Sequence, residues 1–141
     1  MSFSGKIRIS IAIGIVTAVI FSICSFAKTS AEIRSDVLRL HVIANSDSSV
    51  DQNLKLRLRD YILEEGEDIF DGSVNVENAV KKIEPKLAEL ENSAETFVKN
   101  AGFDYDVKIT LSNEYFTTRT YESVTLPAGK YLALRVVIGS G

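Results

Sequence analysis

The sequence contains few of the residues that build covalent or metal-bound frameworks. Its 141 residues include one cysteine, one histidine, two prolines and no tryptophan. A single cysteine excludes an internal disulfide and a cysteine-based zinc site, and a single histidine excludes a site with several histidine ligands. The whole sequence is 45% hydrophobic and 25% charged, which is the composition of a globular protein, and its length suits one domain.

Acidic residues are absent from residues 1–27, where Lys6 and Arg8 are the only charged side chains. All nineteen Asp and Glu lie in residues 28–141 against fourteen Lys and Arg, which gives that part a formal charge of −5. Nucleic-acid binding depends on a basic surface, which supplies much of the affinity. The acidic balance of residues 28–141 therefore argues against a nucleic-acid partner.

Residues 9–27 form an uncharged, apolar run directly after Lys6 and Arg8. A positive start, an apolar stretch and small residues after it are the layout of an export signal. No polar stripe interrupts the run, which argues against a buried core helix, and the run is about long enough to span a bilayer. We therefore expect residues 28–141 to lie beyond the cytoplasmic membrane, with the positive charges inside.

The end of the apolar run leaves two fates for it open. Residues 25–27, Ser-Phe-Ala, match the small-x-small pattern for cleavage after Ala27, and residues 29–31 match it about as well. Without cleavage, the same run would remain as a membrane anchor. Cys24 follows Ile23 rather than a small residue, which argues against lipidation of the cysteine.

The first part of the expected domain reads as a strand, a turn and a helix. Residues 37–44 predict a strand with one wholly apolar face, which the turn formers at 45–48 end. Ser49 and Gln52 have the spacing of a capping box and predict the start of a helix that ends near residues 65–66. The expected apolar stripe of this helix comprises Val50, Leu54, Leu58, Tyr61 and Ile62.

A second helical region follows at residues 76–97, where apolar residues recur at alternating steps of four and three. We interpret this pattern as a core-facing helix rather than an intermolecular coiled coil. Pro85 predicts a kink, or a second helix that begins there. Residues 100–102, Asn-Ala-Gly, predict the C-terminal stop.

Alternation with a period of two begins after this region. The pattern predicts strands at 104–111, 115–125 and 131–138, with a turn at 126–130. The predicted order is β-α-α-β-β-β, an α+β fold with the helices packed on one face of a mainly antiparallel sheet. The chain thus divides into a signal peptide or anchor at 1–27, a linker at 28–36 and one domain at 37–141.

Polar residues around the first turn allow two hypotheses, a catalytic site and a metal site. Ser46 as nucleophile, His41 as base and Asp47 as orienting group would form a hydrolytic triad, but no glycine flanks Ser46 as in a nucleophile elbow. Asp47 and Asp51 lack the spacing of a calcium-binding loop. We therefore expect no catalytic residue, metal or cofactor, and favour a binding or signalling module over an enzyme.

Two segments resemble a known family. Residues 37–63, VLRLHVIANSDSSVDQNLKLRLRDYIL, and residues 126–141, LPAGKYLALRVVIGSG, are similar to the signature of stage II sporulation protein R of endospore-forming Firmicutes. In the first segment the resemblance marks a candidate partner-binding set: His41, Asn45, Ser46, Asp47, Asp51, Gln52, Lys55, Arg59 and Asp60. In the second it marks the turn residues Pro127, Gly129 and Tyr131.

The resemblance implies a signalling role. Such proteins are made in the forespore and exported into the space between the two membranes that separate it from the mother cell. There they activate a membrane-embedded aspartic protease, which removes the pro-segment of the sigma-E precursor. The family continues past residues 139–141 into a segment with tryptophan and cysteine, so we expect this chain to be truncated, and the argument from cysteine content holds only for the chain as given.

Two interpretations of the signature remain open, as do two other functions. The signature residues either contact the protease or specify the strand, turn and helix themselves. The alternative functions are a cell-envelope hydrolase, for example acting on peptidoglycan, and a structural envelope module that dimerises through residues 76–97.

Overall fold

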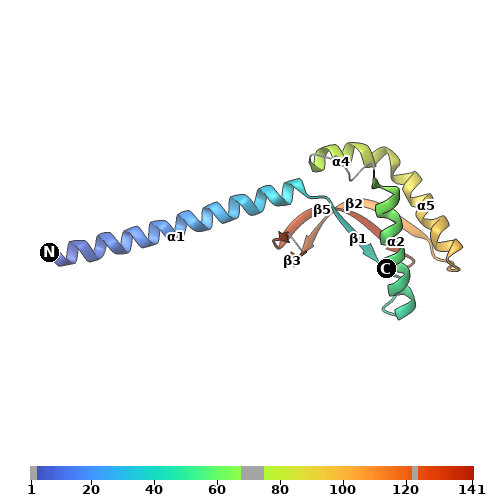
Figure 1. The fold of residues 1–141 in the computed structure, drawn as a ribbon, viewed down its shortest axis with the longest axis horizontal. Helices are drawn as coiled ribbons and strands as arrows, with labels where there is room; N and C mark the ends of the chain where they lie inside the picture. The colour runs from blue at the N-terminus through green and yellow to red at the C-terminus, as the bar shows by residue number, and fades with distance from the viewer. Residues whose placement is uncertain (1–2, 68–74, 122–123) are drawn as a thin grey trace.

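The structure is a computed structural model that describes residues 3–67, 75–121 and 124–141. One long N-terminal helix leads into a domain whose helices pack on one face of a sheet (Figure 1), the α+β architecture that the sequence predicts. The elements in chain order are α1 (Phe3–Asp36), β1 (Arg39–Ile43), α2 (Ser49–Glu65), α4 (Val76–Ile83), the 3₁₀ helix η1 (Glu84–Lys86), α5 (Leu87–Asn100), β2 (Val107–Phe116), β3 (Arg119–Thr120), β4 (Thr125–Leu126) and β5 (Gly129–Ile138).

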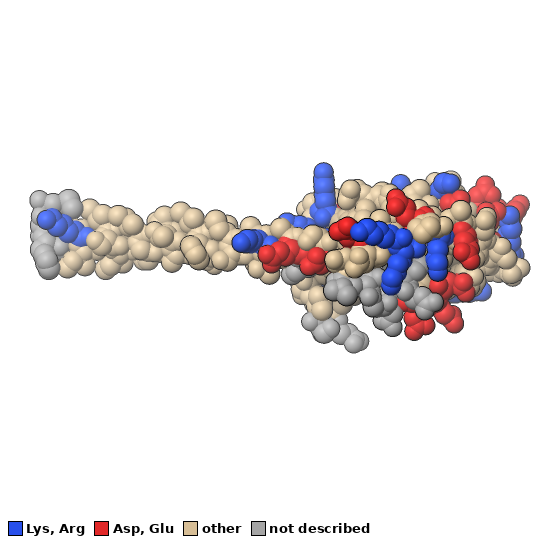
Figure 2. All heavy atoms as spheres, turned by 90° about the horizontal axis from the view of Figure 1, so that it is seen from above, with Lys and Arg blue, Asp and Glu red and all other residues tan. Residues whose placement is uncertain are grey.

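The helix α1 extends away from the domain (Figure 1). Its large apolar side chains are exposed. Within the described part of the chain it is the one helix long and apolar enough to span a membrane. Figure 2 shows basic side chains near its outer end and charges of both signs where it meets the domain, with an uncharged stretch between. Residues 28–36, set out above as a linker, continue α1 as helix to Asp36.

The main sheet has the strand order β1-β5-β2, so the last strand of the chain lies in the middle. β5 pairs with β2 in antiparallel register over ten residue pairs and with β1 in parallel register over five. A parallel pair requires a crossover connection, and here the crossover includes the helices that cover one face of the sheet. The sheet is therefore mixed, and the longer β2–β5 pair is the antiparallel part that the sequence predicts.

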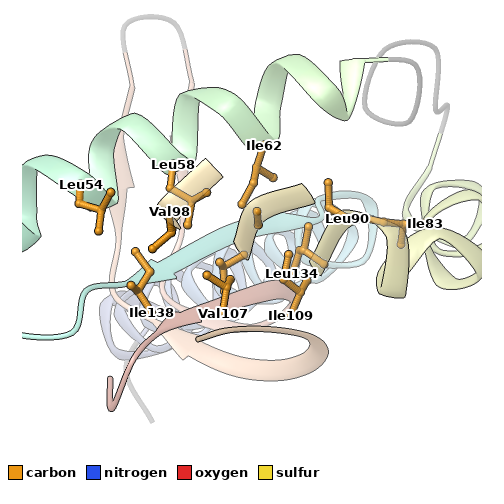
Figure 3. Packing of buried hydrophobic residues seen from close by; sticks show 12 residues of the cluster. Leu54, Leu58, Ile62, Ile83, Leu90, Val98, Val107, Ile109, Leu134 and Ile138 are labelled. Atoms are coloured by element: carbon orange, nitrogen blue, oxygen red, sulfur yellow. The ribbon is translucent and has the colours of Figure 1, made fainter. Parts of the chain in front are cut away.

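The core lies between that sheet face and the helices α2 and α5 (Figure 3). Every second residue of β5 faces it, which is why Leu134, Val136 and Ile138 are fully buried. Leu54, Leu58 and Ile62 supply the apolar side of α2, as the stripe predicts. Val50 was placed wrongly in that stripe: it is exposed, because the buried side of α2 begins with Asp51 in the first turn.

The second helical region is core-facing and broken at proline, as expected. Pro85 lies in η1, which separates α4 from α5. Ile83, Leu90 and Ala94 of the apolar repeat are buried in the core of the same chain, so this stripe is not free for a second copy. α5 ends before Gly102, whose φ of +90° lies in the region that glycine adopts readily.

Two further local predictions are wrong. The N-cap of α2 is Ser48 rather than Ser49: Ser48 is extended, and its hydroxyl accepts a hydrogen bond of 3.1 Å from the backbone N–H of Asp51. Residues 115–125 do not form one strand. β2 continues to Phe116, where its partner β5 begins at Gly129, and beyond that point the chain pairs with itself as the short hairpin β3–β4. Residues 122–123 lie outside the described residues.

Candidate functional site

The turn after β1 is organised around Asp51, a carboxylate buried in the first turn of α2. Ser46 Oγ donates to its Oδ2 at 2.6 Å, and Asn45 Nδ2 donates to the same oxygen at 3.3 Å. The hydroxyl of Tyr105 donates to Oδ1 at 3.2 Å. The hydrogen bond from Ser46 outweighs the effect of burial, and with the bonds from Asn45 and Tyr105 and the nearby Ser48 hydroxyl it holds the pKa of Asp51 below its ordinary value.

Asn45 also joins the two signature segments. Its Oδ1 accepts hydrogen bonds from the backbone N–H of Ser140 at 3.0 Å and from the Ser140 hydroxyl at 3.2 Å. Gly139 has a φ of +62°, and a Cβ there would lie 2.2 Å from Asn45 Oδ1. The close approach therefore requires glycine at this position. We call Asn45, Ser46, Asp51, Tyr105 and Ser140 the inner network.

An open hollow lies beside the inner network, along the end of β1. It is lined by six of the nine predicted partner-binding residues, together with the C-terminal Gly141. Gln52 donates to the carbonyl of Ser46 at 2.9 Å, and Lys55 donates to Gln52 Oε1, so α2 contributes its polar side to the wall. The residues of this signature hollow are His41, Val42, Ile43, Ala44, Asn45, Ser46, Asp47, Gln52, Lys55 and Gly141.

His41 extends to the sheet face opposite the one that α2 and α5 cover, and its partner there is Glu114 of β2. His41 Nδ1 contacts Glu114 Oε2, while Arg135 Nε lies 3.3 Å from Glu114 Oε1. Burial raises the pKa of Glu114, but the hydrogen bond and charge of His41, with Ser112 and Arg135, outweigh it and hold the pKa below its ordinary value. This cluster connects β1 with β2 across the middle strand.

The turn residues Pro127, Gly129 and Tyr131 lie where the start of β5 contacts the end of α1. Tyr131 is buried and donates its hydroxyl proton to the carbonyl of Pro127. A Cβ at Gly129 would lie 2.5 Å from the side chain of Arg34, so glycine leaves space for the end of α1. On the same face the Arg39 guanidinium stacks over the ring of Phe116 at 4.0 Å. These contacts indicate a structural role for the turn motif.

Arg59 and Asp60 lie apart from the hollow, farther along α2. Both are exposed, and they pair with each other, with Arg59 Nε 2.8 Å and Nη2 2.6 Å from Asp60 Oδ1. A surface pair of this kind contributes at most about 1 kcal/mol to stability. The structure therefore does not require these two side chains for folding.

The hydrolytic triad weighed above is not assembled. Ser46 Oγ donates to Asp51, whereas His41 Nδ1 is engaged with Glu114, so the nucleophile and base of that rejected hypothesis have different carboxylate partners. Among residues 3–67, 75–121 and 124–141, no group of three or more His, Cys, Asp or Glu side chains could hold a metal ion.

Several residues of the site escaped the sequence analysis. Glu114 follows Leu111 by three positions, so alternation along the strand places it on the face opposite the core, but nothing in the sequence identifies His41 as its partner. Tyr105 packs against the core, and its hydroxyl also completes the shell around Asp51, a contact that no local pattern in the sequence indicates. Ser140 contacts Asn45 only because β5 lies beside β1, a pairing that the predicted strand order did not specify.

Comparisons with known proteins agree with the resemblance. A family described as stage II sporulation protein R matches residues 34–141. Stage II sporulation protein R of Bacillus subtilis (strain 168) is 30% identical over 109 residues, which cover 77% of this chain and 49% of the relative. The chain thus spans about half the length of that relative, and no solved structure matches it. Its signature segments and the match over residues 34–141 show that the chain belongs to the stage II sporulation protein R family.

Proposed function

We propose that this sporulation protein is an exported signal that activates a membrane-embedded aspartic protease, which then removes the pro-segment of the sigma-E precursor in the mother cell. The observation that carries the proposal is the position of the signature hollow. β1 begins directly after α1, and the hollow lies at the other end of that strand, where the C-terminus also lies (Figure 1). With α1 at one membrane, the hollow faces away from it, toward a partner in an opposite membrane.

Export follows in this proposal from α1. Its apolar run is preceded by Lys6 and Arg8, which remain on the cytoplasmic side of the membrane. Cleavage after Ala27 would release the domain, and retention would tether it. In both cases residues 37–141 act from the far side of the membrane.

Activation in this proposal is a shift in a conformational equilibrium. A bound protein favours the active state of the protease only to the extent that it binds that state more tightly than the inactive one. Asp47, Gln52 and Lys55 line the hollow, and Arg59 lies outside it, one helical turn beyond Lys55 in α2. These polar side chains can form contacts without loss of the inner network. The chain supplies binding energy and no catalytic group.

The test is co-expression of this chain with the protease and the sigma-E precursor in a host that does not sporulate. Cleavage of the precursor, followed by immunoblot, should require this chain. A variant that lacks residues 1–27 should be stable but inactive, because it stays on the wrong side of the membrane. No cleavage by either this chain or its longer B. subtilis relative, with both exported, would contradict the proposal.

A matched pair of variants separates contact from scaffolding. Arg59→Ala changes an exposed signature residue, and Lys81→Ala changes an exposed residue of α4 outside the signature, which pairs with Glu77 at 2.8 Å. We expect Arg59→Ala to reduce cleavage and Lys81→Ala to leave it unchanged. A folded Arg59→Ala variant with full activity would remove this residue from the contact surface.

A further inference from the structure

Large apolar side chains are exposed at the end of the domain where α1 is attached. Tyr115, near the end of β2, is 68% exposed, and Tyr121 and Val124, on the β3–β4 hairpin, are 55% and 51% exposed. Figure 1 shows this hairpin on the side of the domain from which α1 projects. The exposed side chains therefore lie near the point at which the chain reaches a membrane when α1 is inserted.

The hairpin is connected to α1 by short-range contacts. The backbone N–H of Tyr121 donates to the carbonyl of Val124 at 2.8 Å and closes the hairpin. The N–H of Ala128 donates to Thr118 Oγ1 at 3.1 Å, and this bond connects the two ends of the hairpin. The next residue, Gly129, packs against the side chain of Arg34 in α1. The position of the hairpin relative to α1 is therefore determined by the fold.

The lengths of these elements allow the hairpin to reach the lipid headgroups. Arg34 follows Ala27, the end of the uncharged run, by seven residues, which is about 10 Å of helix rise. The five residue steps from Val124 to Gly129 span up to about 16 Å when extended. The headgroup layer adds roughly 5–7 Å outside the hydrocarbon on each side of a bilayer. A hairpin directed back along α1 thus has enough length to meet that layer.

The chemistry of this end also suits a membrane surface. Tyrosine is enriched at the membrane interface, because its ring is apolar and its hydroxyl can hydrogen-bond. Residues 115–130 contain Arg119 and Lys130 against the single acidic residue Glu122, whereas residues 28–141 as a whole carry a formal charge of −5. Basic side chains near a bilayer are attracted to anionic lipids. Residues 115–130 therefore carry a small positive charge within an otherwise acidic domain, and an anionic membrane does not repel them.

We propose that Tyr115, Tyr121 and Val124 form a membrane-contact surface that lies in the headgroup layer of the bilayer that α1 crosses. The inference rests on the membrane placement of α1 in the proposed function and adds an orientation to it. Contacts at both α1 and the hairpin restrict the tilt of the domain. The signature hollow, at the other end of β1, is then held away from the membrane.

The absence of tryptophan from the chain makes a direct test possible. We would reconstitute the full chain carrying Tyr121→Trp in vesicles of phosphatidylethanolamine and phosphatidylglycerol, with and without brominated acyl chains. The matched control is Val50→Trp, since Val50 is 58% exposed in the first turn of α2, next to Asp51 in the chain. Flotation of the vesicles reports insertion of α1, and tryptophan fluorescence reports the position of each site. Tyr115→Trp gives a second reading of the same surface.

We expect both proteins to float with the vesicles. Quenching by brominated lipid should be several-fold stronger for Tyr121→Trp than for Val50→Trp, and quenching by aqueous iodide should be weaker. Equal quenching at both sites in floating protein would overturn the membrane-contact surface while leaving α1 as an anchor. Protection of Tyr121→Trp from iodide without lipid quenching would indicate contact between copies and would also overturn it. Failure to float would contradict the membrane placement itself, and the inference with it.

Discussion

The signature segment contains two groups of side chains with opposite environments. The inner network is held by a buried carboxylate that accepts three side-chain hydrogen bonds and by an asparagine that connects the end of β1 to the end of β5. Asp47, Lys55, Arg59 and Asp60 lie on the outside of the same turn and helix. One sequence motif therefore combines residues that form the fold with residues that are available to a partner. Substitutions in the two groups should have different consequences.

The largest effect is expected at the contact between the two signature segments. Gly139→Ala places a side chain in the left-handed region and 2.2 Å from Asn45 Oδ1. We expect the free energy of unfolding to fall by about 2–5 kcal/mol, as measured by urea unfolding.

Gly102→Ala is the matched control for this substitution. Gly102 also has a positive φ, of +90°, but a Cβ there meets nothing within 4 Å. It should cost only about 1–2 kcal/mol, from the backbone conformation alone. Equal losses for the two variants would show that the Asn45–Gly139 approach adds nothing to stability.

A smaller loss is expected for Asn45→Ala. The substitution removes the acceptor of the Ser140 N–H and a donor to Asp51, and an unsatisfied polar group costs about 1–3 kcal/mol. Asn53→Ala, at an exposed position of α2, should change stability by less than about 0.5 kcal/mol. The Asn45→Ala/Gly139→Ala double variant should lose less than the sum of the single losses, since the first change relieves the clash of the second.

The inner network also predicts how stability depends on pH. The pKa of Asp51 is lowered in the folded protein, so its contribution is present above the ordinary value of about 3.9 and is lost as pH falls through the lower, folded-state value. Ser46→Ala removes the strongest hydrogen bond to Asp51 and raises this pKa. Acid unfolding followed by circular dichroism should then begin at a higher pH than in the parent, whereas Ser49→Ala should leave the onset unchanged. An unchanged onset in Ser46→Ala would mean that Asp51 is stabilised by other groups.

The smallest effect on stability is expected on the outer side of the signature. Arg59→Ala removes an exposed pair with Asp60 and should change the free energy of unfolding by less than about 1 kcal/mol. Urea unfolding measures this directly. A loss of several kcal/mol would place Arg59 in the group that forms the fold, and the comparison between the two groups would no longer hold there.

The sequence predicted the elements whose signals are local. The uncharged run at 9–27, the apolar repeat at 76–97 and Pro85 each depend on neighbouring residues, and each corresponds to an element of the structure. The cap at Ser48 was missed because Ser48 and Ser49 are both good caps and only the backbone conformation distinguishes them. The strand at 115–125 failed because a β-rich composition does not show where the partner strand ends.

The candidate site was predicted less completely than the fold. Signature residues identified the hollow, since six of the nine line it. The partners that organise it, such as Tyr105, Glu114 and Ser140, come from strands far away in the sequence. Their contacts depend on β5 lying between β1 and β2, and strand order is not encoded in any local pattern.

In the proposed function, the outer residues of the signature hollow bind the protease while the inner network maintains the fold. The most direct test is cleavage of the sigma-E precursor by the co-expressed protease with the Asp47→Ala/Lys55→Ala double variant of the full chain, whose urea unfolding is measured in parallel. We predict a parent-like unfolding midpoint and loss of precursor cleavage. Full cleavage by this variant at parent-like stability and export would contradict the claim.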